Sequence, residues 1–300
     1  MRLRIGTRGS ALALWQANEV SRLLRLAGHD CELVTIRTTG DKRQDVPLAT
    51  IGGKGLFIKE LEESLDRGEI DLAVHSLKDV PSIVPERFAL AAFLERADPR
   101  DAWVQPNGKA IDDMRAGAVI GTSAPRRRAQ LRARWPKLHV AEIRGNVDTR
   151  LGKVRQGRCD ALVLASAGLT RLGGEREITA YFSVEQMVPA AGQGIVAVEV
   201  LRDEVAAAVA AISHAPSAVA ARCERGVLQK FGTLLDCYSA VAVHATVGED
   251  EITVRAFFGE IDGERAVRAT VSAHGEKEVI DAAYAKLVEG GAMELIGRDA

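Results

Sequence analysis

The feature that most constrains the fold of this chain is a regular alternation of strand-like and helix-like segments that begins at its first residues. A short apolar strand at residues 3–6 precedes a helical pattern at 10–28. Strand patterns at 31–37 and 71–75 then flank an amphipathic helix at 55–67. This alternation is typical of an α/β domain, in which helices cover both faces of a mostly parallel sheet.

A second alternation of the same design starts at residue 118. Because the chain has 300 residues, more than one core is expected. A further apolar strand at 195–200 and an alanine-rich helix at 202–212 follow it. The predicted elements of the second unit are strands at 118–122, 139–143 and 161–165, and helices at 126–135 and 147–156.

The pattern changes from about residue 217. A helix at 218–231 leads into three segments that alternate apolar and polar residues and are separated by turn residues. These segments, at 238–246, 251–258 and 264–272, predict a three-stranded antiparallel sheet. With the helix expected at 276–289, they form a small α+β third domain.

Charge, hydropathy and cysteine usage exclude several classes of protein. The net charge is −1, which gives no reason to expect a nucleic-acid or membrane partner. No apolar run approaches the roughly 20 residues that span a bilayer, and the N-terminus lacks a signal-peptide pattern. The four cysteines, Cys31, Cys159, Cys223 and Cys237, have neither zinc-ribbon nor disulfide-scaffold spacing. We therefore expect a cytoplasmic protein without a metal site.

Basic residues are concentrated between Thr122 and Arg158, where eleven Lys or Arg stand against two acids. Several follow predicted strands, and ligands bind at the carboxyl ends of strands in parallel sheets. Arginine forks suit carboxylate or phosphate, so we expect a polycarboxylate ligand in a crevice lined by Arg126, Arg127, Arg144 and Arg150. For Arg128, Arg132, Arg134 and Lys137, a solvated helix face is the simpler interpretation.

Four other segments carry candidate chemistry. A Lys78-Asp79 pair follows a buried strand, where a carboxylate could stabilise positive charge or move protons. Gly6-Thr-Arg-Gly-Ser10 ends the first strand, and Ser10 can cap the first helix. The glycines around Lys54 lack the Walker spacing and indicate a hinged flap. Cys237 precedes a strand and is either a reactive or a structural thiol.

Taken in order, these segments resemble the porphobilinogen deaminase (hydroxymethylbilane synthase) family from about Arg4 to the C-terminal helix. Many long motifs in a fixed order are far more specific than any one alone. The matching stretches begin at Gly6 (GTRGSALALWQ), Gly52 (GGKGLFIKEL), Ala73 (AVHSLKDVP), Asp98 (DPRDA), Gly121 (GTSAPRR), Arg144 (RGNVDTR), Ala167 (AGLTRLG) and Pro189 (PAAGQG).

The resemblance implies a transferase that condenses four porphobilinogen units, with loss of ammonia, into hydroxymethylbilane. It implies a dipyrromethane primer held covalently by a cysteine thioether. It also implies two domains like those of periplasmic binding proteins, at 1–96 with 194–214 and at 97–193, and a cofactor-carrying domain at 215–300. The expected partner is the small-molecule substrate alone, bound by a monomer.

Site roles follow from the resemblance, residue by residue. Asp79 is implied as the catalytic carboxylate, a buried counter-charge to the cation left when ammonia departs, and Lys54 and Phe57 as flap residues. The implied cofactor ligands are Cys237, Lys78, Asp79, Ser10, Thr122, Arg126, Arg127 and Arg150. The implied substrate ligands are Arg8, Arg144, Arg150, Arg171 and Gln193.

The chain departs from the family pattern around Cys237. Asp236 and the preceding Leu residues stand where the family has glycines, and Ala240 stands at a proline position. In the family's Thr-Ser-Ser pattern the last serine is Ala124. Two alternatives therefore stay open: a polycarboxylate-binding protein of the same two-lobed fold that does no chemistry, and a homologue with impaired primer loading.

Overall fold

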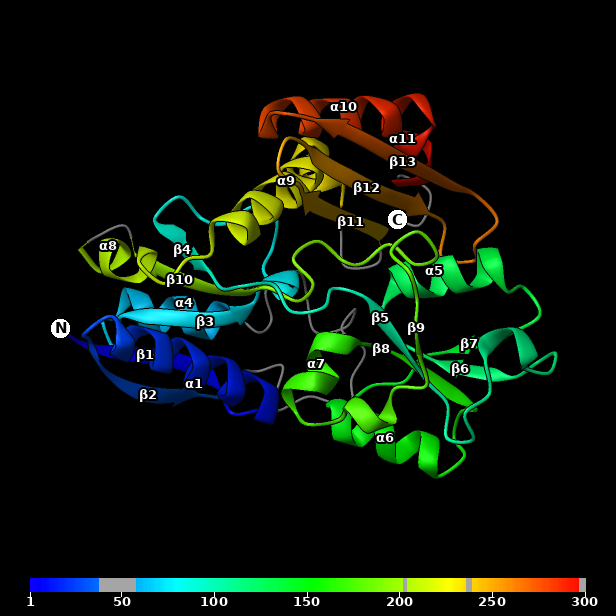
Figure 1. Cartoon of the computed structure of the whole chain (residues 1–300), viewed down its shortest axis with the longest axis horizontal. Helices are drawn as coiled ribbons and strands as arrows, with labels where there is room; N and C mark the ends of the chain where they lie inside the picture. Colours follow the sequence, from blue (N-terminus) through cyan, green and yellow to red (C-terminus); the bar gives the residue numbers. More distant parts are fainter. Residues whose placement is uncertain (38–57, 202–203, 236–238, 297–300) are drawn as a thin grey trace. The chain divides into compact units, whose positions relative to one another are not determined.

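The computed structural model describes residues 1–37, 58–201, 204–235 and 239–296. These residues form two compact units (Figure 1). The first consists of Met1–Ala97 with Gly194–Ala221, and the second of Asp98–Gln193 with Arg222–Ala300. Each is described by itself.

The first unit is built on a five-stranded sheet with the order β2-β1-β3-β10-β4. β1 is parallel to both β2 and β3, whereas β10 is antiparallel to β3 and β4. The strands are β1 (Arg2–Arg8), β2 (Asp30–Ile36), β3 (Leu72–Ser76), β4 (Phe88–Phe93) and β10 (Val196–Leu201). The helices are α1 (Ala11–Leu26), α4 (Lys59–Asp66), η1 (Leu77–Asp79), α8 (Glu204–Ala210) and α9 (Ala215–Phe231), the last of which is divided between the units.

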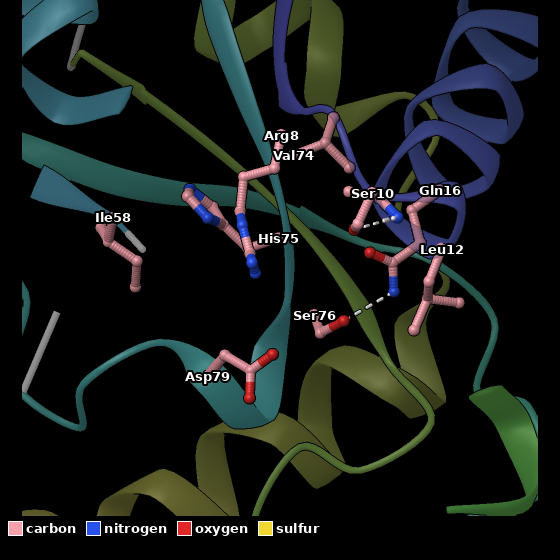
Figure 2. Close-up of a pocket in the computed structure, with 10 residues that line it drawn as sticks. Arg8, Ser10, Leu12, Gln16, Ile58, Val74, His75, Ser76 and Asp79 are labelled. Atoms are coloured by element: carbon pink, nitrogen blue, oxygen red, sulfur yellow. Dashed lines mark hydrogen bonds between the residues drawn. The ribbon is translucent and has the colours of Figure 1, made fainter. Parts of the chain in front are cut away.

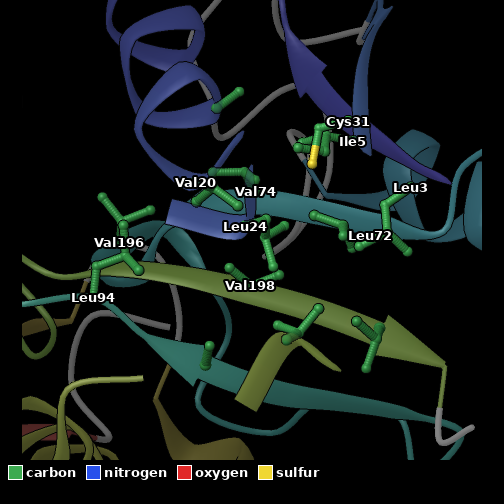
Figure 3. Close-up of a cluster of buried hydrophobic side chains, with 14 residues drawn as sticks. Leu3, Ile5, Val20, Leu24, Cys31, Leu72, Val74, Leu94, Val196 and Val198 are labelled. Carbon is green, nitrogen blue, oxygen red and sulfur yellow. The ribbon is translucent and has the colours of Figure 1, made fainter. Parts of the chain in front are cut away.

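Alternate residues of β3 pack against helices on opposite faces of this sheet, because successive side chains of a strand point to opposite sides. Leu72 and Val74 belong to a buried cluster with Val20 and Leu24 of α1 (Figure 3). On the other face, Ala73 belongs to a cluster with residues of α4. The first unit is thus covered on both faces, as the continuous apolar character of β3 predicts.

The second unit contains a sheet with the equivalent order, β7-β6-β8-β5-β9. β6 is parallel to β7 and β8, and β5 is antiparallel to β8 and β9. The strands are β5 (Asp101–Val104), β6 (Val119–Gly121), β7 (His139–Ala141), β8 (Ala161–Ala165) and β9 (Ala180–Tyr181). The helical elements are η2 (Ile111–Asp113), α5 (Pro125–Arg134), α6 (Val147–Arg155), α7 (Ser166–Arg171) and η3 (Glu175–Glu177).

Two glycines that open sequence motifs lie where a side chain would collide with the core. A Cβ on Gly6 would lie 2.2 Å from the Ile70 side chain, and one on Gly121 would lie 2.6 Å from Ile143. Each glycine is within a strand whose carboxyl end leads to predicted site residues. Absence of a side chain therefore lets strand and covering residues approach closely at these positions.

The C-terminal part of the second unit is a three-stranded antiparallel sheet, β11-β12-β13, with α10 packed against β12 and β13 (Figure 1). β11 also packs on α5, where Ala129 shares a buried cluster with Ala240, Ala242 and Phe257. The elements are η4 (Gly232–Leu234), β11 (Ala240–Val247), β12 (Ile252–Gly259), β13 (Ala266–Ala273), α10 (Glu276–Glu289) and α11 (Ala292–Ile296).

The predicted α/β class, with mostly parallel sheets, and the C-terminal antiparallel sheet are confirmed. Each five-stranded sheet also contains one reversed strand that the sequence did not indicate: β10 and β5 run against both of their neighbours, whereas the other four strands of each sheet share one direction. Strands β4, β5 and β9 were not among the predicted elements. The helix expected at 55–67 is α4 from Lys59, and its predicted first residues lie outside the described part of the chain.

Candidate functional site

The first unit has a pocket of about 70 Å³ at the edge of the sheet where β1 and β3 end (Figure 2). Because these strands are parallel neighbours, their last residues meet there. The polar and charged side chains that line it, among the described residues, are Arg8, Ser10, Gln16, His75, Ser76 and Asp79. Three predicted site residues, Arg8, Ser10 and Asp79, therefore lie around one pocket.

Ser10 forms the wall of this pocket at the N-terminus of α1. Its Oγ accepts a hydrogen bond from the backbone N–H of Ala13 at 3.3 Å, as expected for an N-cap residue. No acidic residue lies in the first turn of this helix. The partial positive charge of the helix N-terminus and the Arg8 guanidinium thus both favour an anionic group nearby.

Gln16 and Ser76 are pocket residues to which the sequence analysis gave no role. The Gln16 Nε2 donates to Ser76 Oγ at 2.7 Å, and this bond joins α1 to the end of β3 (Figure 2). Gln16 is only 2% exposed. A polar residue on the buried face of an otherwise apolar helix is the signal that could have identified it.

Asp79 lies at the end of η1, directly after β3, and its side chain faces the pocket. The expectation of a buried carboxylate is not met, because Asp79 and Lys78 are both exposed. The short η1 helix explains this, since only Leu77 of its three residues is buried and packs in the core.

The second unit has an analogous edge, where the parallel strands β7, β6 and β8 end side by side. Thr122 follows β6 and is buried, and its Oγ1 accepts from the Ala124 N–H at 3.4 Å. Arg144 follows β7, and its Nε donates to Glu142. Arg150, on α6, donates through Nε to the Gly145 carbonyl at 2.7 Å. These predicted ligands therefore gather at one sheet edge.

Arg126 and Arg127, in the first turn of α5, are held by a buried carboxylate that the sequence analysis did not single out. Both Asp101 oxygens accept from Arg126, at 2.6 and 3.0 Å. Asp101 Oδ1 also accepts from Arg127 Nη2 at 2.8 Å and from Gln193 Nε2 at 2.9 Å. Asp101 is completely buried, and the two arginines are 5% and 4% exposed. Gln193 thus contacts this network within the unit.

The charges in this network determine the ionisation of Asp101. Burial by itself raises the pKa of the carboxyl, but the charges of Arg126 and Arg127 and their hydrogen bonds outweigh it and hold the pKa well below its usual range. An ionised Asp101 neutralises only one of two guanidinium groups. The network therefore carries a net positive charge at the start of α5.

Arg171 is a predicted ligand whose electrostatics are governed by desolvation. It lies in the last turn of α7, the helix that follows β8. Burial lowers the pKa of its guanidinium to about 10. Burial in this position favours a counter-anion beside the guanidinium.

Sequence comparison gives the family. Residues 3–208 match the family model described as porphobilinogen deaminase, dipyromethane cofactor binding domain. The porphobilinogen deaminase of Geobacter sulfurreducens is 46% identical over 97% of this chain and 92% of its own length. That of Albidiferax ferrireducens is 43% identical over 97% of this chain and 96% of its own length.

The chain belongs to the porphobilinogen deaminase family. Among solved structures, the methionine-binding protein MetQ matches 70% of the chain with a TM-score of 0.45 and 12% identity.

Membership of the porphobilinogen deaminase family brings with it the dipyrromethane cofactor named by the family model. Three thiols are described, those of Cys31, Cys159 and Cys223, and all are buried and unpaired. Burial raises the pKa of each, to about 12 for Cys223. Buried thiols of raised pKa are poor nucleophiles, so none of the three suits attachment of a cofactor.

Three residues predicted from the porphobilinogen deaminase motifs lie outside the described residues: Lys54, Phe57 and Cys237. Asp79 belongs to the first unit, whereas Arg126, Arg127, Arg144 and Arg150 belong to the second. Their convergence on one crevice stays a prediction. No helix in the described part of the chain is long and apolar enough to cross a membrane.

Proposed function

We propose that this chain is a porphobilinogen deaminase, a transferase that joins four porphobilinogen units head to tail with release of ammonia to give hydroxymethylbilane. The observation that carries the proposal is the pocket of the first unit. There an arginine, a capped helix N-terminus and a carboxylate border the same small space. Porphobilinogen presents matching groups, since its side chains are carboxylates and its ring carries an N–H and a cationic leaving group.

The donor set fits a dipyrromethane cofactor. Its acetate and propionate groups require cations and hydroxyls, which Ser10, Lys78, Thr122, Arg126, Arg127 and Arg150 would supply. Asp79 would accept hydrogen bonds from the pyrrole N–H groups. Since the three described thiols are buried, Cys237 is proposed as the attachment point. When bound, the cofactor supplies the electron-rich pyrrole carbon to which the first substrate unit is added.

Asp79 is proposed as the catalytic carboxylate. Departure of ammonia from porphobilinogen leaves a cation delocalised over the pyrrole ring and its methylene carbon. A carboxylate beside the ring nitrogen stabilises this cation more than the neutral substrate, and this difference accelerates the reaction. Asp79 lies on η1, which is anchored through buried Leu77, so the carboxylate is held at the pocket wall.

The arginines are proposed to bind the carboxylates of substrate and product. Arg8 lines the pocket of the first unit. In the second unit, Arg144, Arg150 and Arg171 would bind the growing chain, together with the surplus charge of the Arg126, Arg127 and Asp101 network. Gln193, already bonded to Arg126 and Asp101, would orient that network toward a bound carboxylate.

We further propose a monomer that works in the cytoplasm and has no nucleic-acid partner. The unpaired thiols of Cys31, Cys159 and Cys223 fit a reducing compartment. The net charge of −1 supplies no attraction for nucleic acid. Size-exclusion chromatography with light scattering tests the monomer directly.

The function is tested by incubating the purified protein with porphobilinogen. Consumption of the substrate, and uroporphyrin after acid oxidation, are the expected results. Intact-mass analysis should show a covalent dipyrrole, and Cys237→Ser should remove this added mass. A protein of unmodified mass that binds but does not consume porphobilinogen would instead be a polycarboxylate-binding protein.

A further inference from the structure

A buried pair of side chains, His75 and Glu199, lies directly behind the pocket of the first unit. His75 is on β3 and Glu199 on the antiparallel neighbour β10. The His75 Nε2 lies 2.9 Å from Glu199 Oε2. Glu199 is completely buried and His75 is 6% exposed. Neither residue has a role in the function proposed above.

One member of the pair reaches the pocket and the other does not. His75 lines the pocket together with Arg8 and Asp79, whereas Glu199 is not among the lining residues (Figure 2). Since Nε2 is taken by Glu199, Nδ1 is the ring nitrogen that remains for another partner. Glu199 therefore touches the pocket indirectly, through the imidazole ring.

Apart from the hydrogen bond to His75, little offsets the cost of burying the Glu199 carboxylate. Its second oxygen, Oε1, has no hydrogen-bond partner among the described residues. The carboxylate of Glu62, on α4, is a neighbouring charge: burial and then the charge of Glu199 raise the pKa of Glu62, and His75, Arg87 and Asp66 also act on it. A buried carboxylate in such a place is stabilised by a partner that can carry positive charge.

The charged groups around His75 come from five elements or their ends. Glu199 faces it from β10 and Glu62 from α4. Arg8 at the end of β1 and Asp79 at the end of η1 share its pocket. Arg87, just before β4, acts on the carboxylate of Glu62. Acidic groups therefore outnumber basic ones around a ring that can accept a proton.

We infer that His75 is the proton acceptor of this pocket and that Glu199 is its positioning residue. This inference rests on the proposed function. Donation from Nε2–H to the carboxylate fixes the tautomer in which Nδ1 has a lone pair. The same carboxylate stabilises the imidazolium that forms when Nδ1 takes a proton. An acid that holds a histidine base in this way is an established arrangement in hydrolases.

The reaction has a proton to remove. After ammonia leaves the substrate ammonium, the cationic methylene carbon accepts an electron pair from a pyrrole α-carbon, and a carbon–carbon bond forms. That α-carbon still carries its hydrogen, and the positive charge is now on its ring. The C–H bond breaks, its electron pair restores the aromatic ring, and His75 Nδ1 takes the proton. Transfer of this proton to the released ammonia gives ammonium and resets the imidazole.

The test compares Glu199→Gln with Asp71→Asn. Asp71 pairs with Arg4 at the far end of β3, with oxygen–nitrogen distances of 2.6 and 2.7 Å, and is not a pocket residue. Glu199→Gln should lower kcat by about tenfold or more with little change in the KM for porphobilinogen. It should also change the 15N NMR chemical shifts of the two His75 ring nitrogens in the purified protein. Asp71→Asn should change neither.

The unmodified protein keeps the inference falsifiable if Glu199→Gln does not fold. In that protein the 15N chemical shifts of His75 must show the tautomer with its hydrogen on Nε2, and the opposite tautomer overturns the inference. His75→Gln should lower kcat by about a hundredfold or more. Turnover within threefold of the unmodified protein would also overturn it. If the unmodified protein consumes no porphobilinogen, the proposed function fails, whereas the NMR comparison still tests the pairing of His75 with Glu199.

Discussion

At the scale of single residues, two of the arginines that the sequence marked as ligands, Arg126 and Arg127, are first of all partners of Asp101. Asp101 was visible in the Asp98-Pro-Arg-Asp101 motif, but nothing local showed that two cations would share it. Asp101 and Arg126 are 25 residues apart in the sequence. Their pairing depends on β5 lying beside β8 and close to the first turn of α5, and periodicity does not reveal this arrangement. The pocket around Arg8 and Ser10 was easier to predict, because Arg8 ends a strand and Ser10 begins the helix that follows it.

Asp101→Asn should destabilise the protein strongly, because it leaves two buried guanidinium groups without an anion. Removing one partner of a buried ion pair costs about 3–5 kcal/mol in free energy of unfolding. The matched control is Asp98→Asn, since Asp98 pairs with Arg100 but is one third exposed. That change should cost about 1 kcal/mol or less. Urea unfolding measures both, and equal losses would contradict the central place of Asp101.

The lowered pKa of Asp101 also determines how the free energy of unfolding should depend on pH. Its pKa is lower in the folded protein than in the unfolded chain, so the unfolded chain binds more protons in acid. The stabilisation is complete above the ordinary Asp pKa, near 4, and is lost as the pH falls toward the folded value. The difference in unfolding free energy between the unmodified protein and Asp101→Asn should therefore narrow below pH 4. The change of this difference with pH should approach about 1.4 kcal/mol per pH unit. A constant difference between pH 6 and pH 3 would contradict this.

At the scale of elements, the turn between β12 and β13 fixes the C-terminal sheet against α5. Gly263 has φ +82°, and a Cβ there would lie 2.6 Å from the Ala133 nitrogen and 2.7 Å from Arg132 Cβ. Arg132 in turn donates to the Ile261 carbonyl at 3.1 Å. These contacts place the turn on the helix whose first turn carries Arg126 and Arg127.

Gly263→Ala should therefore be more destabilising than Gly117→Ala. Gly117 also has a positive φ, of +74°, but nothing lies within 4 Å of a Cβ placed there. Backbone strain should lower the free energy of unfolding of the control, Gly117→Ala, by roughly 1 kcal/mol. Gly263→Ala has the same strain and also a steric collision, which should cost about 1–3 kcal/mol more. The urea midpoint should fall further for Gly263→Ala. Equal midpoints would mean that the turn does not press on α5.

Most elements could be predicted from the sequence, but the reversed strand in each of the two α/β sheets could not. The helices at 147–156 and 276–289 were predicted within a residue of α6 and α10, because amphipathic spacing and end signals are local. The reversal of β5 and β10 depends on long-range pairing, to which a short apolar segment gives no clue. The missed strand β4 is apolar throughout, but three of its six residues are alanine, which is depleted in strands and gives a weak strand signal.

At the scale of the whole molecule, each of the two similar sheets receives its reversed strand just after the chain passes from one unit to the other. β5 follows the passage at Asp98, and β10 follows the passage at Gly194. The backbone joins these points within the first unit, since the Ala97 N–H donates to the Gly194 carbonyl at 3.1 Å. A Cβ on Gly194 would lie 2.4 Å from the Ala97 oxygen. The division into three domains stays a prediction, and the packing of β11 on α5 ties its last two parts together.

The burial of the thiols gives a test of cofactor loading that uses the whole chain. Cys31, Cys159 and Cys223 are buried and of raised pKa, so they should resist alkylation near pH 8 while the protein is folded. In denaturant all three become accessible. A Cys237 that carries the cofactor as a thioether has no thiol to label, so unfolded, loaded protein should take up three alkyl groups for its four cysteines. Mass spectrometry counts the alkyl groups, with Cys237→Ser as the control that also takes up three but lacks the added mass of the dipyrrole.

Four labels on protein that retains the dipyrrole mass would place the attachment on another kind of residue. Four labels without that mass would mean that this chain, with Asp236 and Ala240 beside its cysteine, does not load the primer.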